Sequence, residues 1–577
     1  MAEPDAGCRG LRRIFGLSMS ELSAHTRREN LQRMAREPFD LVIVGGGITG
    51  AGIAWEAAAR GLKTALIDKS DFASGTSSKS SKLVHGGIRY LRQGDLRLTL
   101  AMARERAILR RLAPGVVDWV SFLFPFYGAP GDWLLASLGL WIYDLLAWRS
   151  IPLKHRRVSP HEAARLWPQL RERGLKAAFT YFDGRTDDAR LVLTVLKAAA
   201  RQGALIANYA AATGFLRCRQ RVAGVVVRDM LTGQDLEVRS MAVVNASGPW
   251  LDEVRHYEDR DARPLLFTTK GIHLVVRREH FSARGSTGGD FDLGLLFHSA
   301  RDGREMFVIP WGPLALIGTT DTPYTGDPAD ARAHTEDIAY VLDSINGILK
   351  RRLHPEEILA TFAGVRPLLA QDKAFASDIS RWHRISESSS GLISIGGGKL
   401  TTFRLMARAV VGRVMKRLAG NQRARKDGGP GRATSQGVGG DRLWASSLLP
   451  GAADLDLEEM PLDPDIRDHL VRAYGQDARS LFELTRSHSE LGDRLIPGLP
   501  YIKAEVLYAM RREMALTLTD VLSRRTRLVW EDAGHALPVA ESVARLMARE
   551  LGWTEQEIAA QLAAYRREAF LHSVARS

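Results

Sequence analysis

The clearest pattern of hydrophobic and polar positions lies near residue 40, where a short apolar run ends in glycines and leads into an alanine-rich stretch. Residues 39–44 (FDLVIV) predict a buried strand, because branched apolar side chains dominate the run. Residues 48–60 predict a helix that Gly61 ends, and residues 63–67 predict a second strand. The pattern therefore indicates a strand, a glycine turn, a helix and a strand in succession.

Three glycines in this turn, Gly45, Gly47 and Gly50, match the spacing G-x-G-x-x-G. In dinucleotide-binding folds the first glycine permits the tight turn, the second lets the backbone approach a pyrophosphate, and the third allows close helix packing. Phosphate groups would meet the N-terminus of the helix, and Asp68 follows the second strand where a ribose-binding acid is expected. The sequence thus predicts a dinucleotide site, with a glycine turn used only for packing as the plainer alternative.

The rest of the chain divides into a mixed part and a helical part. Two apolar runs far downstream, residues 241–250 (MAVVNASGPW) and 391–404 (GLISIGGGKLTTFR), again end in small residues. Strands end in this way where a cofactor approaches the backbone closely, so the pattern favours a flavin fold that returns to its cofactor after an inserted domain. Residues 423–441 are rich in glycine, serine and charge and predict a flexible linker, whereas residues 464–570 are almost wholly helix-like.

Length and composition limit the class of protein. The chain has 577 residues, 45% of them apolar, which is enough for two or three domains. Two cysteines, Cys8 and Cys218, provide neither a disulfide framework nor a metal cluster, and they fit a reducing compartment. The net charge of +14 favours anionic partners. Residues 133–148 form the longest apolar window, which is shorter than the roughly 20 residues that span a bilayer and predicts an interfacial segment or a buried helix.

Several further segments, taken together with the glycine motif, carry a resemblance to a known family. The sequence resembles the FAD-dependent glycerol-3-phosphate dehydrogenases of the respiratory, quinone-linked type, and the resemblance covers residues 39–528 almost without interruption. The segments are residues 80–91 (SSKLVHGGIRYL), 181–191 (YFDGRTDDARL), 270–276 (KGIHLVV), 309–324 (IPWGPLALIGTTDTPY), 364–369 (GVRPLL), 396–404 (GGGKLTTFR) and 504–528 (AEVLYAMRREMALTLTDVLSRRTRL).

The resemblance implies an α/β fold with a Rossmann-type FAD-binding domain, an inserted mixed-sheet substrate domain and an α-helical C-terminal domain. We expect a leader (residues 1–37), an oxidoreductase region (38–420), a flexible linker (421–443) and the helical domain (444–577). The FAD-binding segments are expected at about residues 38–115, 190–262 and 361–420, with substrate-domain segments between them.

The activity that the resemblance implies is the oxidation of sn-glycerol 3-phosphate to dihydroxyacetone phosphate. Hydride would pass from C2 to flavin N5, and the electrons would pass to membrane quinone. The implied location is the cytoplasm, at the inner face of the cytoplasmic membrane, for a peripheral or monotopic protein, and a homodimer is the expected assembly. An anionic membrane surface fits the positive charge, since a lysine or arginine near such a surface contributes about 1 kcal/mol.

Three cations in separate motifs, Arg89, Arg366 and Lys399, converge on the substrate if the resemblance holds. Guanidinium groups match phosphate oxygens with a planar fork, and an ammonium supplies a compact charge. Tyr90 and Thr320 would add hydroxyl contacts. The alternative for the arginines is pairing with carboxylates in the core.

His273 is the first choice for the base that removes the hydroxyl proton, since imidazole accepts a proton near neutral pH, and His85 is the second. The resemblance implies that His85 lies against the flavin. Asp187 and Asp188 precede a helix-like segment, so capping is favoured over catalysis. The catalytic prediction is His273 with Arg366 and Lys399. The predicted cofactor contacts are Gly45, Gly47, Gly50, Asp68, Ser80, His85, Gly248, Gly397 and Thr401.

Two other functions remain open from the residues alone. The first is an oxidase of the same fold, which would pass electrons to oxygen and act on glycerol 3-phosphate or on an amine. This alternative stays open because reactivity with oxygen depends on access and electrostatics near the flavin. A nucleic-acid-binding or scaffold protein would also suit the positive charge, but the sequence contains no recognisable nucleic-acid module, and we expect neither a nucleic-acid partner nor a metal.

Overall fold

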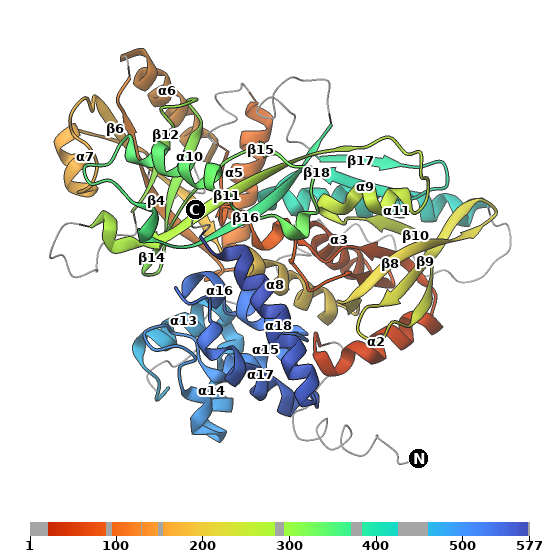
Figure 1. Cartoon of the computed structure of the whole chain (residues 1–577). Coiled ribbons are helices and arrows are strands. Elements are labelled where there is room, and N and C mark those ends of the chain that lie inside the picture. Colours follow the sequence, from red (N-terminus) through yellow and green to blue (C-terminus); the bar gives the residue numbers. More distant parts are fainter. Residues whose placement is uncertain are drawn as a thin grey trace.

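The computed structural model describes residues 21–87, 95–128, 130–147, 154–282, 293–370, 383–424 and 460–574. Two mixed β-sheets and a group of C-terminal helices make up this part of the chain (Figure 1). The predicted α/β fold with two sheets and a helical C-terminal region is confirmed. The start of the predicted leader (1–20) and all of the predicted linker after residue 424 lie outside the described residues, and the exact domain limits stay a prediction.

The first sheet is built around the apolar run near residue 40. β1 (Phe39–Val44) begins and ends where the sequence predicted, because its side chains are buried and glycine follows. It pairs in parallel with β2 (Thr64–Ile67) and β10 (Asp235–Asn245), and β18 (Ile393–Gly397) pairs in parallel with β10. The small-residue strand ends singled out in the sequence therefore meet at one edge. The other strands of this sheet are β7 (Leu205–Ala207), β8 (Ala210–Cys218), β9 (Arg221–Asp229) and β17 (His383–Glu387).

Helices cover both faces of the first sheet. Alternate side chains of β1 pack on opposite faces, Leu41 and Ile43 with α3 (Ile48–Ala59) and Val42 and Val44 with α2 (Ala24–Arg36). The described part of the predicted leader is thus an integral layer of this domain. The helices packed against α3 are α8 (Asp188–Arg201) and α11 (Phe403–Ala424).

The second sheet contains ten strands among the described residues. Its longest pairing joins β11 (Leu266–Arg277) and β16 (Ile358–Leu369) in antiparallel register, with Gly271 opposite Gly364. Because side chains alternate along a strand, His273 and Gly271 point to the same face. The other strands are β3 (Leu83–Val84), β4 (Val117–Phe126), β5 (Arg156–Val158), β6 (Ala177–Thr186), β12 (Leu293–His298), β13 (Glu305–Trp311), β14 (Leu314–Gly318) and β15 (Thr322–Pro323).

Further helices lie along the second sheet and at the C-terminal end of the chain. In Figure 1 the C-terminal helices, in blue, gather on one side of the molecule next to α8 and α2. In the described ranges, no helix is both long enough and apolar enough to cross a membrane. The helices are α5 (Leu96–Leu112), α6 (Pro130–Ala147), α7 (Pro160–Leu166), α9 (Leu251–His256), α10 (Thr335–Asn346), α13 (Pro464–Tyr474), α14 (Ala478–Ser487), α15 (Lys503–Glu513), α16 (Leu528–Glu531), α17 (Leu537–Leu551) and α18 (Glu555–His572), with a π-helix at Asp520–Arg525.

Candidate active site

A cavity of about 690 Å³ is lined by both sheets. The first sheet contributes the carboxyl ends of its parallel strands, where ligands bind in open α/β folds. The second sheet contributes the paired strands β11 and β16, which supply Gly271, His273, Gly364 and Arg366. The cavity therefore lies where a cofactor on the first sheet can meet a substrate on the second.

The glycine turn forms the floor of the first part of this cavity. Gly45 has a φ of +112°, and a Cβ atom added there would lie 2.6 Å from the carbonyl oxygen of Ala246. A Cβ atom at Gly50 would lie only 1.8 Å from the carbonyl oxygen of Gly45, so this glycine allows α3 to pack closely on the turn. Gly45 and Gly47 line the cavity as predicted. Gly50, which was also predicted as a cofactor contact, does not line it, because its role is the close packing of α3.

Asp68, at the end of β2, closes the same turn. One of its carboxylate oxygens accepts a hydrogen bond from the Gly46 amide at 2.6 Å, and the other accepts one from the Ser70 amide at 2.9 Å. Burial raises the pKa of this carboxyl group to about 6. Because Asp68 also lines the cavity, it offers a carboxylate to ribose hydroxyl groups beside the glycine turn.

The other predicted cofactor residues also line the cavity: Ser80, His85, Gly248, Gly397 and Thr401. They come from three separate segments of the sequence, residues 80–85, 248 and 397–401, and hydrogen bonds hold two of them. The Ser80 hydroxyl donates to Asp188 at 2.7 Å, and the Thr401 hydroxyl donates to the His85 carbonyl oxygen at 3.4 Å. The glycine turn, the carboxylate of Asp68 and the size of the cavity together fit FAD.

His273 lies on the wall formed by the second sheet, with 2% of its surface exposed. Its ring stacks on Phe362 with centroids 4.7 Å apart, and its Nε2 atom lies 3.0 Å from the Ser81 hydroxyl oxygen. Burial, helped by the nearby charges of Arg366 and Lys82, lowers the pKa of this histidine to about 3. The imidazole is therefore neutral at physiological pH.

Arg366 is fixed by groups from the loop that follows β14. Its Nη1 atom donates to Asp321 and to the carbonyl oxygen of Thr320, each at 3.0 Å, and its Nη2 atom donates to the Thr319 hydroxyl at 3.0 Å. A Cβ atom at Gly271 would lie 2.2 Å from this guanidinium group. The glycine of the predicted KGIHLVV motif thus provides the space that the arginine occupies.

The structure corrects the prediction for Thr320. This side chain is buried and its hydroxyl oxygen accepts a hydrogen bond from the Ile272 amide at 3.1 Å, so it ties the loop to β11 and does not line the cavity. Its neighbours Thr319 and Asp321 line the cavity in its place. The sequence identified the right segment but not which residue faces the ligand.

Lys399 lines the cavity next to Gly397, at the start of the turn that leads into α11. Arg89 and Tyr90 lie outside the described residues, so their roles stay predictions.

The predicted capping by Asp187 is present, since its carboxylate accepts a hydrogen bond from the Arg190 amide at 3.0 Å. Asp188 is buried and pairs with Lys82 at 2.6 Å, which places it in the support of the cavity wall.

Sequence reasoning missed several cavity residues. Ser81 belongs to the motif that supplied Ser80 and Lys79 immediately precedes it, and this position was the only available signal. Arg304 lies in the sequence RDGRE, which is typical of a solvated turn, and only the fold brings it into the cavity.

The comparisons with known proteins agree with this geometry. The model of the FAD dependent oxidoreductase family matches residues 40–404, and that of the C-terminal domain of alpha-glycerophosphate oxidase matches residues 438–558. The aerobic glycerol-3-phosphate dehydrogenase of Staphylococcus haemolyticus is 34% identical over 547 residues, which are 94% of this chain and 95% of the relative. The chain belongs to the FAD-dependent glycerol-3-phosphate dehydrogenase family. This confirms the resemblance on which the sequence analysis relied.

Two further proteins with the same name are similar to this chain over most of its length. The mitochondrial glycerol-3-phosphate dehydrogenase of Mus musculus is 35% identical over 559 residues, which are 92% of this chain and 73% of the mouse protein. The crystal structure of glycerol-3-phosphate dehydrogenase from Bacillus halodurans, complexed with FAD, has a TM-score of 0.75 and 30% identity, and the match covers 96% of this chain and 99% of that one. The chain is therefore a flavin-dependent oxidoreductase with FAD as its cofactor, as predicted.

Proposed function

We propose that the protein oxidises sn-glycerol 3-phosphate to dihydroxyacetone phosphate at this cavity. The proposal depends on one observation: the cations Arg366 and Lys399 line the same cavity as the glycine turn and Asp68. Cations beside a flavin site suit a phosphate ester better than a neutral alcohol. The names of the relatives with 34% and 35% identity support the same substrate.

His273 acts as the base in this proposal. The proton of the C2 hydroxyl group passes to Nε2 of its ring, the nitrogen next to the cavity-lining Ser81. Stacking on Phe362 fixes the ring plane, and Gly318 leaves room for it, since a Cβ atom there would lie 2.4 Å from the imidazole. When bound, FAD supplies the acceptor for the hydride from C2. Arg366 and Lys399 hold the phosphate so that C2 stays in place.

Anaerobic bleaching of the visible flavin absorbance tests this function. We expect glycerol 3-phosphate to bleach the wild-type holoenzyme, whereas glycerol and an amino acid do not. Arg366→Ala should bleach only at much higher concentrations of the phosphate ester. Bleaching by the amino acid instead would overturn the substrate class, and peroxide formation in air without reduction of a quinone analogue would make the protein an oxidase.

We further propose that α6 places the enzyme on an anionic membrane surface, where quinone accepts the electrons. Five large apolar side chains of this helix are exposed, and four of them recur at the spacing of one helix face. Basic groups flank this surface, since the Arg157 guanidinium lies 4.2 Å above the Trp133 ring and the Arg156 side chain is 60% exposed. The exposed apolar residues are Leu134, Leu135, Leu138, Trp141 and Leu145.

Vesicle binding tests this surface. Sedimentation with vesicles of anionic lipid should retain the wild-type protein, and the double variant Leu138→Glu/Trp141→Glu should stay in solution while keeping glycerol 3-phosphate-dependent bleaching. Met241→Glu, at an exposed apolar residue on β10, is the matched control. Equal sedimentation of both variants would show that α6 is not the contact.

The predicted homodimer is tested separately, by the mass of the enzyme in solution.

A further inference from the structure

Arg304 lies immediately before β13 and lines the cavity on the side of Arg366. Its Nη2 atom donates to one carboxylate oxygen of Asp321 at 2.6 Å. The other oxygen of Asp321 accepts from Nη1 of Arg366 at 3.0 Å. Asp321 has 2% of its side chain exposed, so one nearly buried carboxylate fixes two guanidinium groups side by side at the cavity wall.

The two arginines differ in how the protein uses their donors. Arg366 also binds the hydroxyl group of Thr319 and the carbonyl group of Thr320, so each of its terminal nitrogens donates to the loop at least once. Among the described residues, Asp321 is the only side chain that pairs with the guanidinium group of Arg304, although this group carries five N–H donors. With 16% of its side chain exposed, Arg304 keeps Nε and Nη1 available beside the cavity.

A guanidinium group with spare donors, held rigidly at a cavity wall, suits an anion with several oxygens. A phosphate dianion offers three oxygens and accepts paired N–H groups from a planar fork. The glycine turn on the first sheet would hold the pyrophosphate of FAD, which leaves Arg304 on the second sheet for the substrate.

We propose that Arg304 binds the phosphate group of the substrate directly, as the second arginine of a pair that determines specificity for phosphate esters. Asp321 is the positioning residue that holds Arg304 and Arg366 at a fixed separation. This inference rests on the proposed function, and it adds a binding residue that the family resemblance in the sequence did not supply.

The test measures phosphate binding and turnover separately on FAD-loaded enzyme. Titration calorimetry gives the Kd for inorganic phosphate, and steady-state kinetics give KM and kcat for glycerol 3-phosphate. In Arg304→Ala we expect both Kd and KM to rise by about ten- to a hundredfold, the usual loss for a hydrogen-bonded charged group, with a smaller change in kcat. Arg304→Lys should recover part of the loss, because it keeps the charge without the fork, and it serves if the alanine variant does not fold.

Arg301→Ala is the matched control. Arg301 lies in the same hairpin, is 55% exposed and does not line the cavity, so its removal should leave Kd and KM unchanged. An unchanged Kd for phosphate with a lowered kcat in Arg304→Ala would show that Arg304 acts only through Asp321, and would overturn the inference. Loss of FAD with unchanged phosphate affinity in the loaded fraction would do the same by assigning Arg304 to the cofactor.

The wild-type enzyme separates this inference from the proposed function. If it binds phosphate in an Arg304-dependent manner but is not reduced by glycerol 3-phosphate, the proposed substrate is wrong and the phosphate site stands.

Discussion

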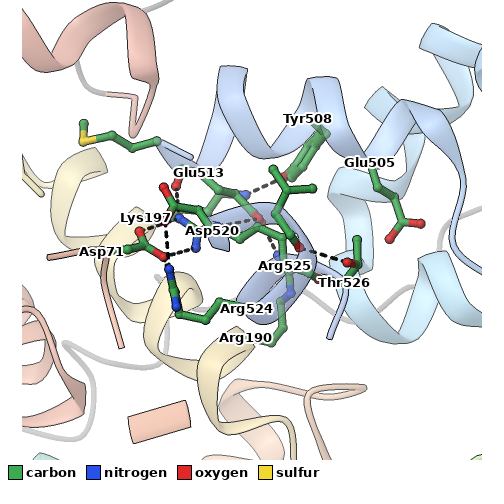
Figure 2. A network of polar contacts seen from close by, with 12 residues as sticks. Asp71, Arg190, Lys197, Glu505, Tyr508, Glu513, Asp520, Arg524, Arg525 and Thr526 are labelled. Carbon is green, nitrogen blue, oxygen red and sulfur yellow. Dashed lines mark hydrogen bonds and ion pairs between the residues drawn. The ribbon is translucent and has the colours of Figure 1, made fainter. Parts of the chain in front are cut away.

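Arginines gather in two regions of this molecule, and the regions use them differently. At the interface between the first sheet and the C-terminal helices, Arg190, Arg524 and Arg525 are buried together with the carboxylates of Asp71, Glu513 and Asp520 (Figure 2). At the cavity, Arg304 and Arg366 keep some exposure and share one carboxylate. The interface pairs three cations with three anions, whereas the cavity pair leaves donors for a ligand.

Asp71 accepts hydrogen bonds from both Arg524 and Arg525 in the interface network (Figure 2). Its carboxylate accepts from Nε of Arg524 at 2.5 Å and from Nη1 and Nη2 of Arg525 at 2.6 and 3.0 Å. The Asn208 amide donates to it at 3.2 Å. Arginine as a residue type therefore does not identify a ligand site. The distinguishing features are how many anions surround the guanidinium groups and whether a cavity lies beside them.

The largest effect is expected from removing the central anion of the interface. Asp71→Asn leaves Arg524 and Arg525 buried against a neutral amide, and breaking a buried pair in this way costs about 3–5 kcal/mol of unfolding free energy. Urea denaturation measures the loss. Glu541→Ala breaks the exposed pair with Arg545 and should leave the free energy of unfolding almost unchanged. Equal losses in the two variants would remove the contrast between buried and exposed pairs.

The cavity should respond in activity more than in stability. Gly271→Ala places a methyl group within 2.6 Å of three atoms of the Arg366 guanidinium group, so the arginine must move. A displacement of about 1 Å in a positioning group lowers the rate about a hundredfold. We expect kcat/KM for glycerol 3-phosphate to fall by about that factor while the flavin content stays near that of the wild type. A variant with full kcat/KM would show that the placement of Arg366 matters little.

Acid should weaken the interface before it affects the rest of the fold. Burial alone would raise the pKa of Asp71, but the Arg525 and Arg524 charges outweigh it and lower the pKa from 3.8 to about 2. A carboxyl group with a lowered folded pKa contributes stability above its unfolded pKa and loses it as the pH falls. We therefore expect about 2 kcal/mol of stability to disappear between pH 4 and pH 2. The same titration of Asp71→Asn should lack this component.

A smaller pH effect is expected at the cofactor turn, in the same direction but from a pKa that is raised and not lowered. Burial raises the pKa of Asp68 to about 6, so the carboxyl group of the apoprotein takes up a proton below that pH. Ribose hydroxyl groups donate to the ionised form, and the Kd for FAD should rise by up to about tenfold per pH unit below pH 6. Fluorescence quenching of added FAD measures this, and Asp68→Asn should bind more weakly at every pH without the inflection. A flat profile in the wild type would show that FAD does not contact Asp68.

The sequence was sufficient for the elements with strong local signals. The bounds of β1, the glycine turn and Asp68 followed from a short apolar run and from fixed spacings. The Thr320 prediction was wrong because the direction of a side chain in a loop depends on tertiary hydrogen bonds, here the bond from the Ile272 amide. Arg304 was missed because a charged turn between strands has the same pattern whether it meets solvent or a cavity.

The interface network was beyond sequence reasoning for a related reason. Arg524 binds Asp71 across 453 positions of the chain, and no periodicity within either segment indicates the partner. Both segments were visible separately, the first as part of the nucleotide-binding unit and the second as part of a helical motif. Only the fold shows that they meet.

The 453 positions between Asp71 and Arg524 also determine when the two residues can pair during protein synthesis. At about 5–20 residues per second, the ribosome adds the residues between Asp71 and Arg524 over roughly 20–90 s. During that time the nucleotide-binding unit can form its sheet, but Asp71 has neither of its arginine partners. The loop after β2, which contains Asp71, therefore stays exposed to solvent. A message truncated before codon 524 would yield a chain whose cofactor loop never acquires its counter-charges, and we expect such a product to be a preferred target of cellular proteases.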